Sequence, residues 1–507
     1  MHSVPRRKFL ACVTSGGLVA NLLRQFPAPS MPLPGRERQT TPDVRFNDEI
    51  EPWVRVLEET PHDQVVGVMA KHVMEGRIGY RQFLAAVFLA GIRNIQPRPS
   101  VGFKFHAVLV VNSAHLASLD AAEKEKWLPL LWAVDSFKRS QARDVSEGNW
   151  TMASVNDARL PSAVRCLDEF RTAMEGWDEE RADAATAALS RVHTSDEIFE
   201  QFAAYASRDF RSIGHKAIYL ANSFRTLETI GWHHAEPVLR SLSYALLNHV
   251  GEENPATNDH LADRDGRNNW NLVRRLREDW MAGSDDEGAT VELLECLRRG
   301  TSTEASQLVF EQLQRGVATT SIYNALFVFA SELTMRQPAI VPLHAVTTTN
   351  AMHYIFRKVR SPQTRAFVLL QNAAFLPHFL AESQRRGALA DRAVEQFIAQ
   401  EPLPTPSDIP QNVFVELGRS PTVAAQQVFA YLNQGNPVSP LIQQARTQIF
   451  LKGDDSHDYK YSSAVLEDYF QIGPAWRDRY FAAALFKMRH AGERTTGLIQ
   501  QIQQILG

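Results

Sequence analysis

The chain has 507 residues, of which 44% are hydrophobic and 22% are charged, and its formal net charge is −3. This composition is ordinary for a globular protein and argues against extensive disorder, and the near-neutral charge leaves no electrostatic footprint for nucleic acid. Only three cysteines occur, so a disulfide framework is excluded, although Cys166 and Cys296 could form a single pair.

The N-terminus has the layout of a signal peptide, with a basic start followed by a short apolar run. The run has roughly 13 residues, too few for a membrane-spanning helix of about 20 residues. The pair Arg6 and Arg7 fits the address read by the twin-arginine (Tat) translocase, although a disordered terminus with a chance arginine pair is the alternative. We expect residues 1–30 to be a twin-arginine signal peptide, residues 31–44 a flexible linker, and the mature protein to be soluble and periplasmic or otherwise extracytoplasmic.

Helical periodicity dominates residues 45–507, where apolar residues recur at three- and four-residue spacing. The clearest predicted helices are, in chain order, residues 63–75, 80–95, 103–119, 122–137, 195–206, 216–229, 235–248, 305–315, 322–334, 345–359, 361–384, 390–400, 423–432, 439–451, 464–470 and 476–489. The predicted loops are residues 96–100, 252–269, 282–288, 402–411 and 453–456. We therefore expect an all-α fold with a single large multi-helix domain over residues 45–507.

Four of the sixteen histidines stand at the start, or in the first turn, of otherwise apolar helical segments: His106, His215, His344 and His457. Imidazole is the commonest metal ligand in proteins, and helical folds build metal centres from one inward ligand on each of several helices. No local HxxxH or HxxE pair links the four histidines, so each could also be a hydrogen-bonded core residue. The pattern predicts a four-histidine metal site, and the core alternative stays open.

Lys460 follows His457 by three residues, which places both side chains on one helix face. A lysine held beside imidazoles in an apolar interior cannot easily keep its charge. It would have to be neutral, paired with Asp455 or Asp458, or chemically converted. Carbamylation of the neutral amine by carbon dioxide would make it an oxygen ligand, whereas a solvated Lys–Asp pair is the alternative.

Other polar residues are weaker candidates. His115 and His353 each follow a candidate histidine by nine residues, which puts them on the opposite helix face. Gln371 and Asn372 interrupt an apolar run and need partners, so they either line a pocket or satisfy a kinked backbone. The chain has no GxGxxG after a strand, no GxxxxGK[ST], no GxSxG, no HExxH and no CxxC. These absences argue against a Rossmann-type nicotinamide or flavin enzyme.

Four short segments, taken in order, resemble the questin oxidase-like family. Phe105-His106-Ala107-Val108-Leu109 is similar to its first histidine helix, and His215-Lys216-Ala217-Ile218 to its second. Pro342-Leu343-His344-Ala345-Val346-Thr347 is similar to its His-Ala-Val-Thr segment, and Ser456-His457-Asp458-Tyr459-Lys460 to its C-terminal His-x-x-Lys segment. The resemblance covers about residues 60–490, nearly the whole mature chain.

The resemblance implies an all-helical fold and oxygen chemistry on aromatic polyketides, of Baeyer–Villiger or ring-cleaving type. Some members hold non-haem iron with histidines and a carboxylated lysine. Transferred to the matching positions of this chain, the family's ligand set implies Fe(II) or another transition metal held by His106, His215, His344, His457 and Lys460. The implied substrates are dioxygen and an aromatic or quinone-like small molecule. The alternatives are a non-catalytic helical binding protein and a metal-dependent hydrolase.

The chain departs from the family pattern at several places. Phe105 replaces the usual Asn before the first histidine, and Ala107-Val108 replaces Gly-Pro after it. Lys216 places a charge directly after His215, where the family has a small residue. An export signal is also not expected of an enzyme that tailors polyketides. These departures count against the expected substrate class more than against the expected metal.

Overall fold

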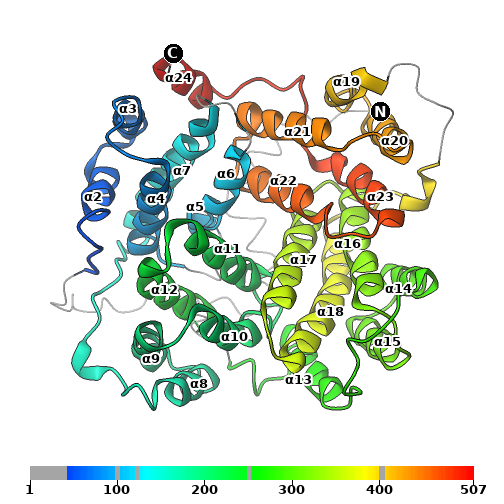
Figure 1. Cartoon of the computed structure of the whole chain (residues 1–507), viewed down its shortest axis with the longest axis horizontal. Coiled ribbons are helices and arrows are strands. Elements are labelled where there is room, and N and C mark those ends of the chain that lie inside the picture. The colour runs from blue at the N-terminus through cyan, green and yellow to red at the C-terminus, as the bar shows by residue number, and fades with distance from the viewer. Residues whose placement is uncertain are drawn as a thin grey trace.

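The structure is a computed structural model that describes residues 43–97, 103–119, 121, 125–247, 253–398 and 406–506. These residues form one large all-helical domain without strands, and its only extended pairings are isolated bridges between Asp43 and Ala153 and between Ser284 and Val317 (Figure 1). The prediction of an all-α single domain is therefore confirmed. The predicted signal peptide and most of the predicted linker lie outside the described residues.

The helices of the first half of the domain range from α5, a single turn, to the long α7. They are α2 (Glu51–Glu59), α3 (His62–Met74), α4 (Tyr80–Asn94), α5 (His106–Leu109), α6 (Val111–Ser118), α7 (Leu128–Glu147), α8 (Cys166–Gly176), α9 (Glu179–Val192), α10 (Ser195–Ala206), α11 (His215–Ile230) and α12 (Ala235–Leu247). Several begin with side-chain caps: Thr194 and Glu197 form a capping box on α10, which satisfies backbone N–H groups that the first turn leaves without partners.

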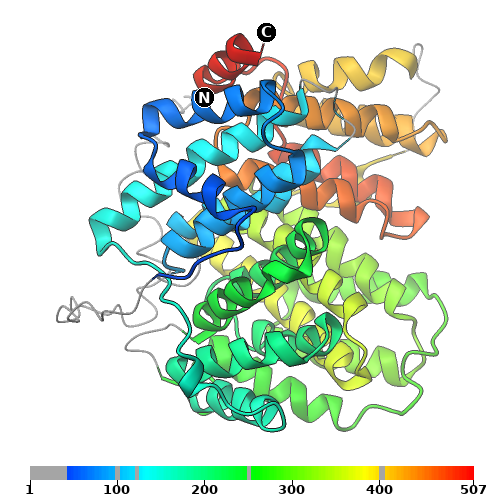
Figure 2. The ribbon, with the colours of Figure 1, turned by 60° about the vertical axis from the view of Figure 1, so that its left-hand side comes forward.

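The second half contains α18, the longest helix among the described residues. Its helices are α13 (Leu261–Val273), α14 (Glu287–Arg299), α15 (Ser302–Gln314), α16 (Thr319–Arg336), α17 (Ile340–Lys358), α18 (Pro362–Arg386), α19 (Ile409–Glu416), α20 (Pro421–Asn433), α21 (Ser439–Lys452), α22 (Ser456–Asp468), α23 (Pro474–Ala484) and α24 (Gly497–Leu506). No helix among the described residues is long and apolar enough to cross a membrane. The two ends of the domain meet, since α24 packs on α3 and α7, and Figure 2 shows these helices together in the upper part of the molecule.

Four helices that are far apart in the chain enclose the centre of the domain. α6 packs on α11, α11 on α17, α17 on α22, and α22 on α6, so the four helices form a closed ring around a common interior. α17 is buried over most of its length, including the polar side chains of Thr347, Thr348, Thr349 and Asn350. This ring positions the candidate site described below.

Two sequence predictions are wrong in the described residues, and a disulfide that the sequence left open does not form there. Residues 261–269 were predicted as part of a loop but open α13, whose inward side chains include Asp263, Asp265 and Asn269. Buried polar residues at these positions remove the apolar periodicity on which the prediction depended. The predicted helix over 390–400 contains only a short 3-10 turn at Val394–Gln396, and Cys166 and Cys296 are both free thiols.

Several boundaries also differ from the predicted ones; α7, for example, ends at Glu147 rather than at residue 137. The predicted helix over 103–119 is divided at Val110, where α5 ends and α6 begins. The predicted loop over 402–411 overlaps the first residues of α19. Seven observed helices match no predicted helical segment: α2, α8, α9, α13, α14, α19 and α24.

Candidate metal centre

The four candidate histidines all lie at the beginning of helices. His106 and His215 are the first residues of α5 and α11, His457 is the second residue of α22, and His344 lies in the second turn of α17. On α22 the side chain of Asp455 accepts a hydrogen bond from the His457 backbone N–H and caps the helix. The predicted placement at a helix start or first turn is confirmed for His106, His215 and His457, whereas α17 begins at Ile340 and places His344 one turn further in.

Three of the four histidines form one buried cluster. His106 and His215 approach through their Nε2 atoms at 2.8 Å, and His215 and His344 approach through theirs at 3.1 Å. One ligand atom from each of the three rings lies within 4.8 Å of the others. Residues from α5, α11 and α17, separated by more than 100 positions along the chain, are thus brought to one point.

The hydrogen bonds on the outer side of the rings set their tautomers. His215 Nδ1 lies 2.7 Å from the Ser212 carbonyl oxygen, and His344 Nδ1 lies 2.7 Å from the Ile340 carbonyl oxygen. A carbonyl oxygen only accepts, so each Nδ1 carries the proton. In the neutral rings both Nε2 atoms then present lone pairs to one another.

These facing lone pairs fit a metal ion. Imidazole nitrogens coordinate at about 2.0–2.1 Å, so two ligands on one ion at an angle of about 90–110° lie about 3 Å apart. The distances of 2.8 and 3.1 Å between the Nε2 atoms match this spacing. Backbone carbonyls that receive the outer N–H groups are also the usual second layer around metal-bound histidines.

His457 is a neighbour of the cluster rather than a member of it. Its ring centroid lies 4.5 Å from that of His106 and 5.2 Å from that of His344. Its Nδ1 lies 2.6 Å from Asp455 Oδ1, a carboxylate–histidine pair of the kind that orients metal ligands. Burial alone would raise the pKa of Asp455, but the charge and hydrogen bonds of His457 outweigh it and lower that pKa.

Lys460 is 3% exposed, and its Nζ has no hydrogen-bond partner among the described residues. Burial lowers its pKa to about 7, although the Asp455 carboxylate opposes the shift. Asp455 instead bonds His457, and Asp458 pairs with Arg489. The alternative of a solvated Lys–Asp pair is therefore wrong.

The three clustered histidines are held in the neutral form. Burial lowers the pKa of His106, His215 and His344 well below the ordinary value of 6.5, and the positive charge of Lys460 lowers all three further. Metal ions bind the neutral imidazole, because a protonated ring has no free lone pair. The electrostatics of the interior therefore favour the ligand form of each ring.

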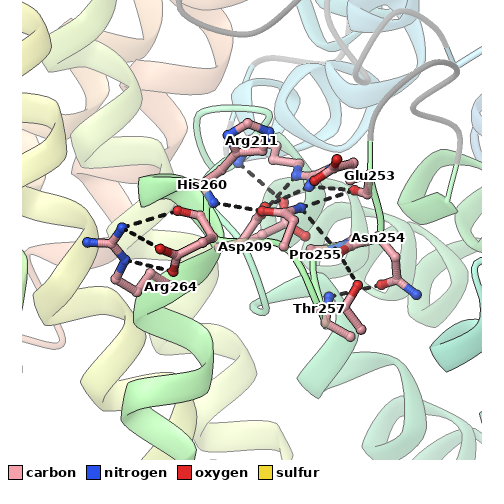
Figure 3. Close-up of polar contacts among 12 residues, drawn as sticks. Asp209, Arg211, Glu253, Asn254, Pro255, Thr257, His260 and Arg264 are labelled. Atoms are coloured by element: carbon pink, nitrogen blue, oxygen red, sulfur yellow. Dashed lines mark hydrogen bonds and ion pairs between the residues drawn. The ribbon is translucent and has the colours of Figure 1, made fainter.

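A buried ion-pair network supports the segment before His215. Lys216 Nζ lies 2.9 and 2.8 Å from the two carboxylate oxygens of Asp209, and Arg211 bonds both oxygens of Asp263 at 2.8 and 2.6 Å. Figure 3 shows Arg211 between Asp209 and the Glu253 backbone, whose carbonyl accepts a further bond from Arg211. The charge that Lys216 places beside His215 is thus compensated by Asp209.

The backbone of this segment turns sharply into α11. Ile213 and Gly214 have φ angles of +44° and +80°, in the left-handed region. A Cβ on Gly214 would lie 2.0 Å from Thr348 Oγ1, so only glycine allows α11 to approach α17 this closely. Close approach of the two helices brings His215 against His344.

The structure places the remaining polar candidates outside the histidine cluster. His115 bonds Tyr80, and the His353 ring packs edge-on against Tyr323 and Phe327, so both histidines lie away from the cluster, as predicted. Gln371 donates to the backbone carbonyls of residues 207 and 208 and accepts from Asn269. It therefore anchors the segment that leads to His215 rather than lining the site.

Sequence reasoning missed the supporting residues Asp209, Asp263 and Gly214. An acidic residue near Lys216 was a usable signal for Asp209, whereas Asp263 lies in a stretch predicted as a loop.

Comparison with known proteins gave no matching family model, no matching curated protein and no matching solved structure.

Proposed function

We propose that this protein is an exported, metal-dependent oxidoreductase, with non-haem iron held by His106, His215 and His344. The observation that carries the proposal is the approach of the His215 and His344 Nε2 atoms to 3.1 Å while both rings donate their Nδ1 protons outward. The resemblance to questin oxidase-like proteins supports iron over other metals and an aromatic or quinone-like substrate. The Arg6-Arg7 pair supports export by the twin-arginine route, which carries folded proteins.

His457 and Lys460 complete the proposed ligand set. The His457 ring contacts two of the clustered rings edge-on and is oriented by Asp455, so His457 would be a further ligand beside the three. The buried Lys460 amine, with its pKa lowered to about 7, reacts with carbon dioxide more readily than a surface lysine, and the carbamate would add an anionic oxygen ligand. A bound iron ion would supply redox and dioxygen chemistry that amino-acid side chains lack.

Elemental analysis of the purified full chain tests the proposal. We expect about one equivalent of a transition metal per chain, in line with one three-histidine cluster. His106→Ala and His344→Ala should lose the metal, whereas His353→Ala should keep it, because His353 lies outside the cluster. Metal below about 0.2 equivalents in the unmodified protein would favour a non-catalytic binding protein.

Oxygen consumption separates the proposed reaction from hydrolysis. The metal-loaded protein should consume dioxygen with a hydroquinone, and the rate should fall to background in His344→Ala. A metal-dependent hydrolase would retain its metal and consume no dioxygen. Zinc as the bound metal, together with no oxygen uptake, would overturn the oxidoreductase proposal.

A further inference from the structure

The four candidate histidines differ in how their rings are held. His215 and His344 each donate their Nδ1 proton to a backbone carbonyl oxygen at 2.7 Å, and His457 pairs with Asp455 at 2.6 Å. The His106 ring forms no hydrogen bond with any described residue other than His215. The place of His106 in the cluster therefore depends on the backbone that carries it.

The helix that carries His106 is too short to fix the ring by itself. α5 has only four residues, His106–Leu109, and its N-cap residue Phe105 makes no side-chain capping hydrogen bond. Helices shorter than about 12 residues have little stability of their own and depend on tertiary contacts. The contacts of the preceding 3-10 turn, Phe103–Phe105, therefore decide where His106 lies.

Phe105 supplies an apolar contact at this turn. Its side chain is fully buried and packs edge-on against Tyr219, with 4.9 Å between the ring centroids. Tyr219 follows His215 by four residues on α11, so the two side chains share a helix face. This contact holds the start of α5 against the helix that carries His215.

Lys104 supplies a polar contact, two residues before His106. Its Nζ lies 2.6 Å from Asp144 Oδ1 and 3.0 Å from Glu147 Oε2 on α7. The side chains of Lys104 and Asp144 are only 3% and 2% exposed. Separation of such a pair leaves two buried charges without compensation, so the ion pair holds the 3-10 turn in one position against α7.

Asp144 is itself fixed by backbone groups on two sides. Its Oδ1 also accepts a hydrogen bond from the Gln96 N–H at 2.9 Å, and its Oδ2 accepts one from the Trp150 N–H at 2.7 Å. These bonds tie the carboxylate to the residues that follow α4 and α7. Lys104 therefore reaches an anchor whose position does not depend on α5.

We propose that Lys104 and Asp144 are positioning residues of the metal centre, whose buried ion pair holds the start of α5 so that the His106 ring meets His215. Neither residue is a ligand. The consequence for metal binding rests on the proposed function, whereas the placement of His106 does not. Loss of groups that orient metal ligands from outside typically lowers metal affinity about 10–100-fold.

Titration of the chelator-treated full chain with cobalt(II), without dioxygen, tests the inference. Lys104→Met removes the link to Asp144 and should weaken cobalt binding about 10–100-fold. The visible absorption of bound cobalt should also change, because it reports the number and geometry of the ligands. Lys104→Arg keeps the charge and the hydrogen-bond donors and should bind cobalt more tightly than Lys104→Met.

Lys138→Met is the matched control. Lys138 is also buried, at 7% exposure on α7, but its Nζ donates to the backbone carbonyls of Leu57 and Glu58 on α2. This variant should bind cobalt as the wild type does, even where denaturant unfolding shows a comparable loss of stability. Unchanged cobalt affinity in Lys104→Met, or an equal loss in Lys138→Met, overturns the inference.

Crystal structures of the metal-free wild type and of Lys104→Met make the test independent of metal binding. In the variant, His106 Nε2 should leave its position 2.8 Å from His215 Nε2, and an unmoved ring overturns the inference. Displacement of the ring together with no cobalt binding by the wild type refutes only the proposed function. If Lys104→Met does not fold, Lys104→Gln takes its place. It still donates a hydrogen bond to Asp144, and its expected loss of affinity is about tenfold.

Discussion

The Nε2 atoms of His215 and His344 face one another at 3.1 Å, although the Nδ1 proton of each ring is directed to a backbone carbonyl. Two neutral rings in this arrangement repel through their lone pairs. A shared proton or a metal ion removes the repulsion, and burial lowers the pKa of both rings, which disfavours the proton. The relationship therefore favours a metal ion and makes the stability of the metal-free protein sensitive to acid.

Chelator-treated protein should lose stability as the pH falls below about 6.5. The folded-state pKa of His106, His215 and His344 is lowered, so below that pH the unfolded chain takes up protons that the folded state does not. Each such histidine lowers the free energy of unfolding by up to about 1.4 kcal/mol per pH unit. Urea unfolding between pH 7.5 and 5.5 measures how steeply the free energy of unfolding falls with pH. His344→Leu should reduce this slope by the equivalent of one bound proton. A flat profile would contradict neutral histidines.

Replacement of Lys460 by methionine should stabilise the metal-free protein at pH 7 and below. The folded-state pKa of Lys460 is about 7 against an ordinary 10.5, so the unfolded chain binds more protons between these values. The wild-type protein therefore gains stability as the pH rises through that window, by up to about 1.4 kcal/mol per unit. Lys460→Met should abolish this gain in urea unfolding, whereas Lys71→Met, at an exposed helical lysine, should preserve it.

Loss of the Asp209 carboxylate should destabilise the protein strongly. Asp209→Asn leaves the buried Lys216 ammonium without its counter-charge, and breaking a buried pair from one side costs about 3–5 kcal/mol. The double variant Asp209→Leu/Lys216→Met removes both charges and should recover most of this loss. Denaturant unfolding of the single and double variants gives the coupling energy, and equal destabilisation in both would contradict a paired Lys216.

A methyl group at Gly214 should separate α11 from α17 and weaken the metal site. Gly214→Ala meets Thr348 at 2.0 Å and keeps an unfavourable φ of +80°. Gly435 has the same φ with nothing within 4 Å, so Gly435→Ala isolates the cost of the backbone angle, about 1 kcal/mol. Gly214→Ala should lower the free energy of unfolding by clearly more than Gly435→Ala does. It should also reduce the affinity for the metal, measured by competition with a chelator. An equal loss of stability and an unchanged metal affinity in both variants would show that the metal site does not need the close approach of α11 to α17.

The sequence indicated the helical class and the positions of the ligands along the chain, because both depend on local patterns. Apolar spacing predicted α10 at its observed bounds, and the histidines at the starts of apolar segments were recognisable without a structure. The same method failed at α13, where the inward residues Asp263, Asp265 and Asn269 bind partners from distant parts of the chain. A polar residue with a distant buried partner has no local signature.

Only the tertiary structure decided which histidines meet. His106, His215 and His344 lie in three helices that are more than 100 residues apart in sequence, and their convergence depends on the packing of α5, α11 and α17. The same packing places His457 beside the cluster and buries Lys460 without a partner. By itself the sequence determined which side chains were available for chemistry. Their distances and charge states were decided by contacts between distant helices, which short-range periodicity does not encode.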